Sequence, residues 1–380
     1  MKTLDDINFY DRTVLLRADL NSDVVNDRVI KSERIRAASE SISELKRRGA
    51  KVVVIAHQGR AGKDDFVSLK THARLLNKFV KIKFIDDILG EKAIKAIENL
   101  KIGKVILLEN IRFEEDEFKP EKGKNNKLIK NLLPLIDVYI NDAFSVCHRI
   151  QTSIVGFPKY VNNGIGRLLE KELKALKNLK IEKSLIILGG AKPEDNIKFL
   201  KGNKILSCGL FGQMCLIAKG FKFGAQDDYL KKEIKNFNAI NKTLKRKLKN
   251  VETPIDFAVK VNGKRKELKL EEFPSEYKIF DIGGETIKNY TDEIRKSSSI
   301  FMKGPAGDCS DKRFCRGTYS ILKAISKKRG FSLIGGGHLS NAIRRSGISR
   351  RKFGHVSLSG GAMLRYINGE KLAGLRVLEQ

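Results

Sequence analysis

The chain has 380 residues, of which 41% are hydrophobic and 32% are charged. This composition is typical of a folded protein of two or three domains and excludes a disordered chain. Lys and Arg number 75 against 45 Asp and Glu, giving a formal net charge of +30. The excess is spread along the chain and is interpreted mainly as solvated helix faces, so any binding of nucleic acid is expected to be non-specific.

Membrane, zinc and disulfide signals are all weak. No apolar run approaches the roughly 20 residues needed to span a bilayer, and the N-terminus has no apolar signal region. No pair of cysteines has CxxC spacing, so neither a disulfide framework nor a zinc site is expected. The five are Cys147, Cys208, Cys215, Cys309 and Cys315. A reducing cytoplasm is the expected compartment.

In the first half of the chain, short apolar runs alternate with longer amphipathic stretches. Strands are predicted at Val14–Leu20, Val52–Ile55, Ile82–Ile85, Val105–Leu108 and Ile136–Ile140. Helices are predicted at Arg34–Arg48, where apolar residues recur at helical spacing before Gly49, and at Ser68–Phe79. This alternation predicts a parallel sheet covered by helices on both faces.

The pattern restarts after a turn-rich segment, Gly156–Gly166, and a charged helix that runs to about Leu179. Strands are predicted at Ser184–Leu188, Ile205–Cys208, Ile255–Val259, Ile300–Met302 and Ser332–Ile334, and helices near Leu210–Lys219, Tyr229–Lys249, Thr286–Arg295, Phe314–Lys328 and Leu339–Arg345. We therefore predict an α/β protein of two doubly wound, Rossmann-like parallel-sheet domains joined by a hinge helix. The expected domains are residues 1–160 and 161–361, with residues 362–380 packing back on the first.

Ligands of such sheets bind beyond the carboxyl ends of the strands. In the first half, those ends carry two histidines and four arginines among other polar residues. The set is Asp19, Asn21, Arg34, His57, Arg60, Arg112, His148 and Arg149. Because the guanidinium fork matches pairs of phosphate or carboxylate oxygens, the set predicts a site for a small molecule that bears both groups.

In the second half, the segments after the strands are rich in glycine. They include Gly189-Gly190-Ala191-Lys192, Cys208-Gly209, Gly283-Gly284-Glu285-Thr286, Gly304-Pro305, Gly335-Gly336-Gly337-His338 and Gly360-Gly361. Glycine lets a backbone approach a ligand closely, and N–H groups at helix starts favour phosphate, so six such turns predict a nucleotide site. No G-x-x-x-x-G-K-[ST] loop or protein-kinase motif is present, which disfavours those two classes.

Several segments together resemble one family. LLRADLN, ERIRAA, AHQGR, LLENIRF, NDAF with HR, LGGAK, GGGH and HVSLSGGA occur in the order expected of phosphoglycerate kinase, and the short loops and His338 resemble its archaeal branch. The resemblance implies reversible phosphoryl transfer between ATP and the carboxylate of 3-phosphoglycerate, in glycolysis and gluconeogenesis. It also implies a cytoplasmic enzyme, expected to be a monomer, with Mg²⁺ carried by ATP or ADP and no metal site in the free protein.

The resemblance also assigns roles. It implies that the eight polar residues given above bind 3-phosphoglycerate, and that Arg34 and Lys192 neutralise charge on the phosphoryl group during transfer. It assigns the nucleotide to Gly189, Gly190, Lys192, Gly209, Gly304, Pro305, Gly335, Gly336, Gly337, His338, Gly360 and Gly361. The two sites are expected on different domains, so that closure about the hinge would bring the substrates together and exclude water.

The departures from the family pattern concentrate in the second domain. Asn196 stands where many members have a second lysine, and Lys303 replaces an asparagine before Gly304-Pro305. The other departures are Cys208, Gly284, Ser310, His338 and Ser359. Since Asn196 has no charge, Lys192 is expected to carry a larger share of the neutralisation. Two alternatives stay open: a catalytically weakened homologue, and a nucleic-acid-binding protein on the same fold.

Overall fold

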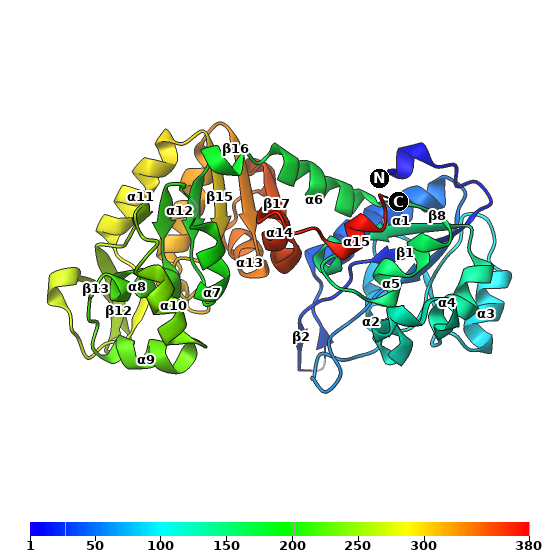
Figure 1. Cartoon of the computed structure of the whole chain (residues 1–380), viewed down its shortest axis with the longest axis horizontal. Coiled ribbons are helices and arrows are strands. Elements are labelled where there is room, and N and C mark those ends of the chain that lie inside the picture. The colour runs from blue at the N-terminus through cyan, green and yellow to red at the C-terminus, as the bar shows by residue number, and fades with distance from the viewer. Residues whose placement is uncertain (27, 201, 380) are drawn as a thin grey trace. The chain divides into compact units, whose positions relative to one another are not determined.

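The structure is a computed structural model that describes residues 1–26, 28–200 and 202–379. It divides into two compact units: unit 1 contains Met1–Lys174 and Gly361–Gln380, and unit 2 contains Ala175–Gly360. Each unit is built on a six-stranded parallel sheet with helices packed on it (Figure 1). The predicted α/β fold of two Rossmann-like parallel-sheet domains is therefore confirmed. Within the described residues, no helix is both long and apolar enough to cross a membrane.

The sheet of unit 1 has the strand order β5-β6-β4-β1-β7-β8, and all neighbouring strands are parallel. Its strands are β1 (Thr13–Ala18), β4 (Lys51–Ile55), β5 (Lys83–Phe84), β6 (Val105–Leu107), β7 (Val138–Asp142) and β8 (Asn162–Ile165). A small hairpin, β2 (Val24–Val25) and β3 (Arg28–Val29), lies outside this sheet. The central strands are continuous apolar runs because helices cover both faces of a parallel sheet.

The helices of unit 1 pack on that sheet. They are α1 (Glu33–Arg47), α2 (Lys70–Leu76), α3 (Glu91–Glu98), α4 (Lys127–Leu132), α5 (Thr152–Val155), most of α14 (Gly360–Ile367), and α15 (Ala373–Arg376). In α1 the predicted apolar face, including Ile35 and Ile42, is fully buried. The C-terminal segment returns to this unit, where α15 lies against α5 (Figure 1) and the Gly374 N–H donates to the Cys147 carbonyl at 2.8 Å.

The turn-rich segment that the sequence suggested as a boundary lies inside unit 1. Its strand β8 pairs with β7, and the division between the units falls at Lys174–Ala175, within α6 (Arg167–Asn178). The first turn of α6 is capped by a buried carboxylate, since Asp142 Oδ1 accepts the N–H groups of Leu168 and Leu169 at 2.9 and 3.1 Å. The end of β7 therefore fixes the start of this helix.

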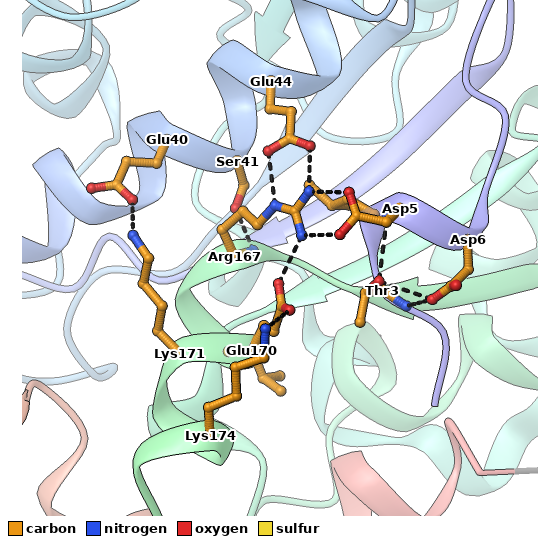
Figure 2. Close-up of polar contacts among 12 residues, drawn as sticks. Thr3, Asp5, Asp6, Glu40, Ser41, Glu44, Arg167, Glu170, Lys171 and Lys174 are labelled. Carbon is orange, nitrogen blue, oxygen red and sulfur yellow. Dashed lines mark hydrogen bonds and ion pairs between the residues drawn. The ribbon is translucent and has the colours of Figure 1, made fainter.

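A dense ion-pair cluster holds the first turn of α6 to the rest of unit 1 (Figure 2). The Arg167 guanidinium donates to Glu44 on α1 at 2.8 Å, to Asp5 at 2.9 Å, and to Glu170 at 2.8 Å. Its backbone N–H also donates to the Ser41 hydroxyl at 2.8 Å. These hydrogen bonds raise the pKa of Arg167, so the cation holds three carboxylates around it.

The main sheet of unit 2 has the order β11-β10-β9-β15-β16-β17 and is also fully parallel. Its strands are β9 (Leu185–Leu188), β10 (Ile205–Ser207), β11 (Val251–Glu252), β15 (Ser299–Lys303), β16 (Phe331–Gly335) and β17 (His355–Ser357). The prediction missed β11 and β17, the two edge strands. They have two and three residues, too few to show a period.

One predicted strand belongs to a different sheet. The segment predicted as Ile255–Val259 forms β12 (Asp256–Val261), which pairs antiparallel with β13 (Lys264–Lys269) and β14 (Ile279–Ile282). The β12–β13 turn contains Asn262 and Gly263, both with positive φ, and Asn-Gly is the preferred pair for a tight hairpin. The Gly283-Gly284 turn follows β14, so it does not lie at the carboxyl edge of the parallel sheet.

The helices of unit 2 largely follow the prediction, with one correction. They are α7 (Pro193–Asn196), α8 (Gly209–Ala218), α9 (Ala225–Glu233), α10 (Phe237–Leu244), α11 (Gly284–Lys296), α12 (Arg316–Lys327) and α13 (Gly337–Ser346). The single helix predicted at Tyr229–Lys249 is wrong. Asn236, which adopts a left-handed conformation with φ of 58°, separates α9 from α10. Asparagine tolerates this conformation better than most residues, and it interrupts a helix.

The cysteine prediction is also wrong in one respect. Cys309 and Cys315 form a disulfide within the loop between β15 and α12, while Cys147, Cys208 and Cys215 are buried free thiols. The spacing rules describe zinc sites and small secreted frameworks, and they do not cover a pair that closes one short loop. Only the three-dimensional turn brings these two side chains together.

Candidate functional site

Four neighbouring strands of unit 1 carry the predicted polar residues to one edge of the sheet. Asp19 comes directly after β1, His57 follows β4, Arg112 lies in the turn after β6, and Arg149 lies in the loop after β7. The charges of Arg17, Arg112, Arg149 and Arg34 all act on His57. The structure thus brings together side chains that are more than 100 residues apart in the sequence.

Asp19 and Arg34 form the ion pair of this edge. One Arg34 nitrogen, Nη1, lies 2.6 and 2.7 Å from the two Asp19 oxygens and donates to the Ser145 hydroxyl at 3.0 Å. The Asp19 side chain is fully buried, whereas that of Arg34 is 23% exposed. The carboxylate therefore orients the guanidinium, which keeps a face toward solvent.

A second set of contacts holds Arg112. The Gly59 N–H donates to Asn21 Oδ1 at 2.9 Å, and the Gly59 carbonyl accepts a hydrogen bond from Arg112 Nη1. The other two nitrogens of that guanidinium, Nε and Nη2, are buried and have no hydrogen-bond partner among the described residues. Burial, with the nearby charge of Arg149, lowers the pKa of Arg112 to about 10. Buried donors without partners indicate that a ligand supplies the acceptors.

His57 forms a hydrogen bond with Arg17, a residue that the sequence analysis did not single out. Arg17 lies inside β1 and is fully buried, and its Nη2 lies 3.0 Å from His57 Nδ1. A guanidinium can only donate, so Nδ1 is the acceptor and the neutral ring carries its proton on Nε2. Burial, followed by the charge of Arg17, holds the pKa of His57 well below its usual value. His57 is thus a neutral hydrogen-bond donor.

A buried carboxylate, that of Glu117, offsets the positive charge of Arg17. Arg17 Nε donates to the Ser153 hydroxyl at 2.9 Å, and that hydroxyl donates to Glu117 at 2.7 Å. Glu117 also accepts the Ser153 N–H at 2.8 Å, and burial raises its pKa. The signal in the sequence was the arginine itself, which interrupts an otherwise apolar strand.

The remaining predicted residues complete the cluster. The pKa of Arg149 is lowered mainly by burial and, to a smaller extent, by the charges of Arg60 and Arg17. The Arg60 side chain is exposed. Burial lowers the pKa of His148 to about 4, and its buried Nδ1 has no partner among the described residues. The cluster holds five arginines and the two buried carboxylates Asp19 and Glu117. Within this set, three positive charges are uncompensated.

In unit 2, four of the predicted glycines pack against backbone. The N–H groups of Gly189 and Gly190 donate to the carbonyls of Lys303 and Pro305, both at 2.8 Å, and the Gly209 N–H donates to the Ala306 carbonyl at 3.0 Å. A Cβ atom at Gly189 would lie 2.4 Å from the Pro305 carbonyl oxygen, and one at Gly304 equally close to the Gly189 carbonyl. Because these glycines have no side chain, the loops after β9, β10 and β15 can pack closely and form backbone hydrogen bonds with one another.

The turn after β16 is different. Gly335 is buried at the end of the strand, but Gly336, with φ of 109°, and Gly337 have open space where a side chain would be. Gly337 begins α13, and the neighbouring His338 is exposed. Gly360 lies 3.8 Å from Gly336, measured from its ideal Cβ position. An accessible helix N-terminus with no side chains in the way suits a phosphate group.

Two further features of unit 2 are Lys192 and the loop after β15. Lys192 is exposed and directly precedes α7, and its side chain forms no hydrogen bond or ion pair with another described residue. Ser310 lies in the loop closed by the disulfide and lines a cavity of about 600 Å³ with Phe280 and Phe314. Among the residues described, no group of three or more His, Cys, Asp or Glu side chains could hold a metal ion.

Comparison with known proteins gives one consistent result. The family model described as "Phosphoglycerate kinase" matches residues 4–370. Phosphoglycerate kinases of Methanothermobacter thermautotrophicus and Methanothermus fervidus are 40% and 37% identical to the chain, and each alignment covers all of it and 97% of the relative. The crystal structure of phosphoglycerate kinase from Pyrococcus horikoshii OT3 superposes with a TM-score of 0.92 at 35% identity, covering 100% of this chain and 98% of that one. The enzyme structure from Coxiella burnetii gives a TM-score of 0.81 at 26% identity, covering 100% and 99%.

Proposed function

The chain belongs to the phosphoglycerate kinase family, and we propose that unit 1 binds 3-phosphoglycerate while unit 2 binds the nucleotide. The reaction is the reversible transfer of the γ-phosphoryl group of ATP to the carboxylate of 3-phosphoglycerate, which gives 1,3-bisphosphoglycerate and ADP. The resemblance that the sequence showed, including its archaeal character, is confirmed by relatives that match over the full length.

The substrate assignment rests on one observation: the arginine cluster of unit 1 has an excess of positive charge next to N–H donors of Arg112 that lack acceptors among the described residues. A phosphate monoester carries about −1.5 to −2 charges at pH 7 and a carboxylate carries one more, so the substrate brings nearly three. Among the five arginines, Asp19 and Glu117, three positive charges are uncompensated, and two nitrogens of Arg112 lack acceptors among the described residues. A ligand with one phosphate and one carboxylate would satisfy both.

We assign the substrate's phosphate to Arg60, Arg112 and Arg149, and its carboxylate end to Arg34 and the Nε2–H of His57. Asp19 and Asn21 act through their partners, since the first orients Arg34 and the second holds the turn at Gly59. The attacking carboxylate is already ionised at neutral pH, so no general base is needed. The protein contributes positioning and charge neutralisation.

On the nucleotide side, the open turn at Gly336-Gly337 and the start of α13 are the proposed phosphate contacts, and Lys192 the cation that meets the transferring group. Mg²⁺ is expected to arrive as the complex with ATP or ADP, as part of the substrate. We propose a monomer that acts in the cytoplasm. The full-length family match favours this enzyme over the weakened homologue and the nucleic-acid-binding protein.

A coupled assay with ATP, Mg²⁺ and 3-phosphoglycerate tests the function directly. Arg149→Ala tests the assignment of unit 1, because it should weaken 3-phosphoglycerate binding by about 1.5–3 kcal/mol, the value of charge-assisted hydrogen bonds, and leave ADP binding nearly unchanged. Calorimetry with each ligand separately gives both numbers. Equal losses for the two ligands would contradict the placement of the sites on separate units.

A further inference from the structure

Lys303 lies at the centre of the carboxyl edge of the main sheet in unit 2. It is the last residue of β15, and in the register of the sheet it lies opposite Leu188 of β9 on one side and Gly335 of β16 on the other. The turn at Gly189-Gly190 and the open turn at Gly336 therefore begin next to it on both sides. Its side chain is only 13% exposed.

The contacts of Lys303 leave its charge only partly balanced. Its Nζ donates to Asn196 Oδ1 at 2.7 Å and forms a longer hydrogen bond and ion pair, at 3.5 Å, with Asp195, whose side chain is 44% exposed. The Asn196 amide is fixed in this orientation because its Nδ2 donates to the Gly189 carbonyl at 3.1 Å. An ammonium group has three N–H donors, and here one short bond goes to a neutral acceptor.

A mostly buried cation needs close counterions, because burial disfavours the charged form. Asp195 supplies one, but at 3.5 Å and on a partly exposed side chain. Burial lowers the pKa of Lys303 although the carboxylates of Asp195 and Glu194 oppose the shift, and the positive charge of Lys192 adds a smaller effect in the same direction as burial. Lys192 is thus near enough to act on it electrostatically. The two lysines come from neighbouring strand ends, and an anion between them would stabilise both.

We propose that Lys303 is a second cation of the phosphoryl-transfer site, contacting the nucleotide phosphate chain beside Lys192. The inference rests on the proposed function, and it adds a residue that the family pattern does not supply at this position. In that pattern a lysine is expected at 196 and an asparagine at 303. Here the two residues have exchanged identities, and their side chains are in direct contact.

The exchange between positions 196 and 303 shows that the uncharged Asn196 does not leave the site without a second cation. One ammonium group and one amide still occupy this pair of positions, so the site keeps the cation that Asn196 alone would have lost. The chain thus has two lysines for the transferring group, and the departure at 196 no longer indicates a weakened enzyme.

The test uses kcat measured in the full-length enzyme with ATP, Mg²⁺ and 3-phosphoglycerate. Lys303→Asn and Lys303→Met, which remove the charge in different ways, should each lower kcat by about 10²-fold, the scale of one lost charge-stabilising donor. The double exchange Asn196→Lys/Lys303→Asn restores one ammonium and one amide, and should return kcat to within about tenfold of the wild type. Lys323→Asn, on the exposed side of α12, removes the same charge and should change nothing.

The thermal unfolding midpoint and the affinity for 3-phosphoglycerate separate a catalytic role from a structural one, because a charge acting on the nucleotide moves neither. A Lys303→Asn enzyme that keeps more than half of the wild-type kcat would overturn the inference. So would a double exchange as slow as the single variant at an unchanged unfolding midpoint. A wild-type protein without kinase activity would instead contradict the proposed function.

Discussion

At the scale of single residues, several polar side chains of the site are each oriented by a second side chain. Asp19 orients Arg34, Arg17 fixes the tautomer of His57, and Asn196 positions Lys303. Lys192 differs from these residues, since its side chain is exposed and has no hydrogen bond or ion pair within the described chain. A mobile cation of this kind can follow the phosphoryl group as its charge develops.

We predict that Lys192→Ala lowers kcat by about 10²-fold or more, comparable to the loss of one oxyanion donor. Binding of either substrate alone should change little, because the contact strengthens mainly in the transition state. Steady-state kinetics and calorimetry on the same preparation measure both. A variant that keeps more than about half of the wild-type kcat would show that the charge comes from elsewhere, with Lys303 the first residue to examine.

The sequence predicted those site residues whose position follows from one rule, that ligands bind beyond the carboxyl ends of parallel strands. It did not single out Arg17, because a charged residue inside an apolar strand gains a role only when the fold places it against His57. Lys303 stood in the sequence only as a departure from a pattern. Its contact with Asn196 joins residues 107 positions apart, which no local spacing reveals.

At the scale of elements, the start of α6 depends on one buried carboxylate. Asp142 is fully buried, and burial raises its pKa to about 7, although the Ser41 hydroxyl and two helix N–H groups oppose this shift. The folded-state pKa lies above the unfolded value, so folding is favoured while the group is protonated. The contribution of the protonated Asp142 to the free energy of unfolding is complete below a pH of about 4 and is lost as the pH rises through about 7.

Asp142→Asn should therefore raise the thermal unfolding midpoint relative to the wild type at pH 8, by at least about 2 °C. The amide oxygen keeps an acceptor for Leu168 and Leu169 but carries no charge. The difference should shrink as the pH falls and should disappear only below a pH of about 4. Asp142→Ala is the matched control, since it removes the cap and should cost about 1–2 kcal/mol. A midpoint for Asp142→Asn below that of the wild type at pH 8 would contradict the protonation argument.

Helices and strands were predicted correctly where burial of one face gave the sequence a regular hydrophobic pattern. They were predicted wrongly where a local turn determined the path of the chain. The long helix α1 and the central strands had clear patterns, whereas Asn236 split one expected helix and Asn262-Gly263 turned β12 into a separate hairpin. Both failures arise at asparagines with positive φ, and the second carried a recognisable turn signal. The disulfide between Cys309 and Cys315 had no such signal, because only the folded loop brings the pair together.

At the scale of the whole molecule, the two proposed sites lie on separate compact units, so the reaction needs both units to meet around the substrates. We predict that 3-phosphoglycerate and nucleotide together compact the protein, and that either alone does so less. Small-angle scattering on the free, singly bound and doubly bound protein measures the radius of gyration. An identical value in all four states would argue against closure as the step that assembles the site.

The return of the C-terminal segment to unit 1 has a consequence for synthesis on the ribosome. Unit 2 is one continuous segment, Ala175–Gly360, and can fold as soon as it emerges. Unit 1 emerges first but is completed last, since Gly374 packs tightly on Cys147 and Ile154 near its core. For the time needed to translate about 200 more residues, at about 5–20 per second, the first half of the nascent chain has an uncovered apolar patch where α15 will bind. The order in which the parts of this enzyme are made is thus the reverse of the order in which they can be finished.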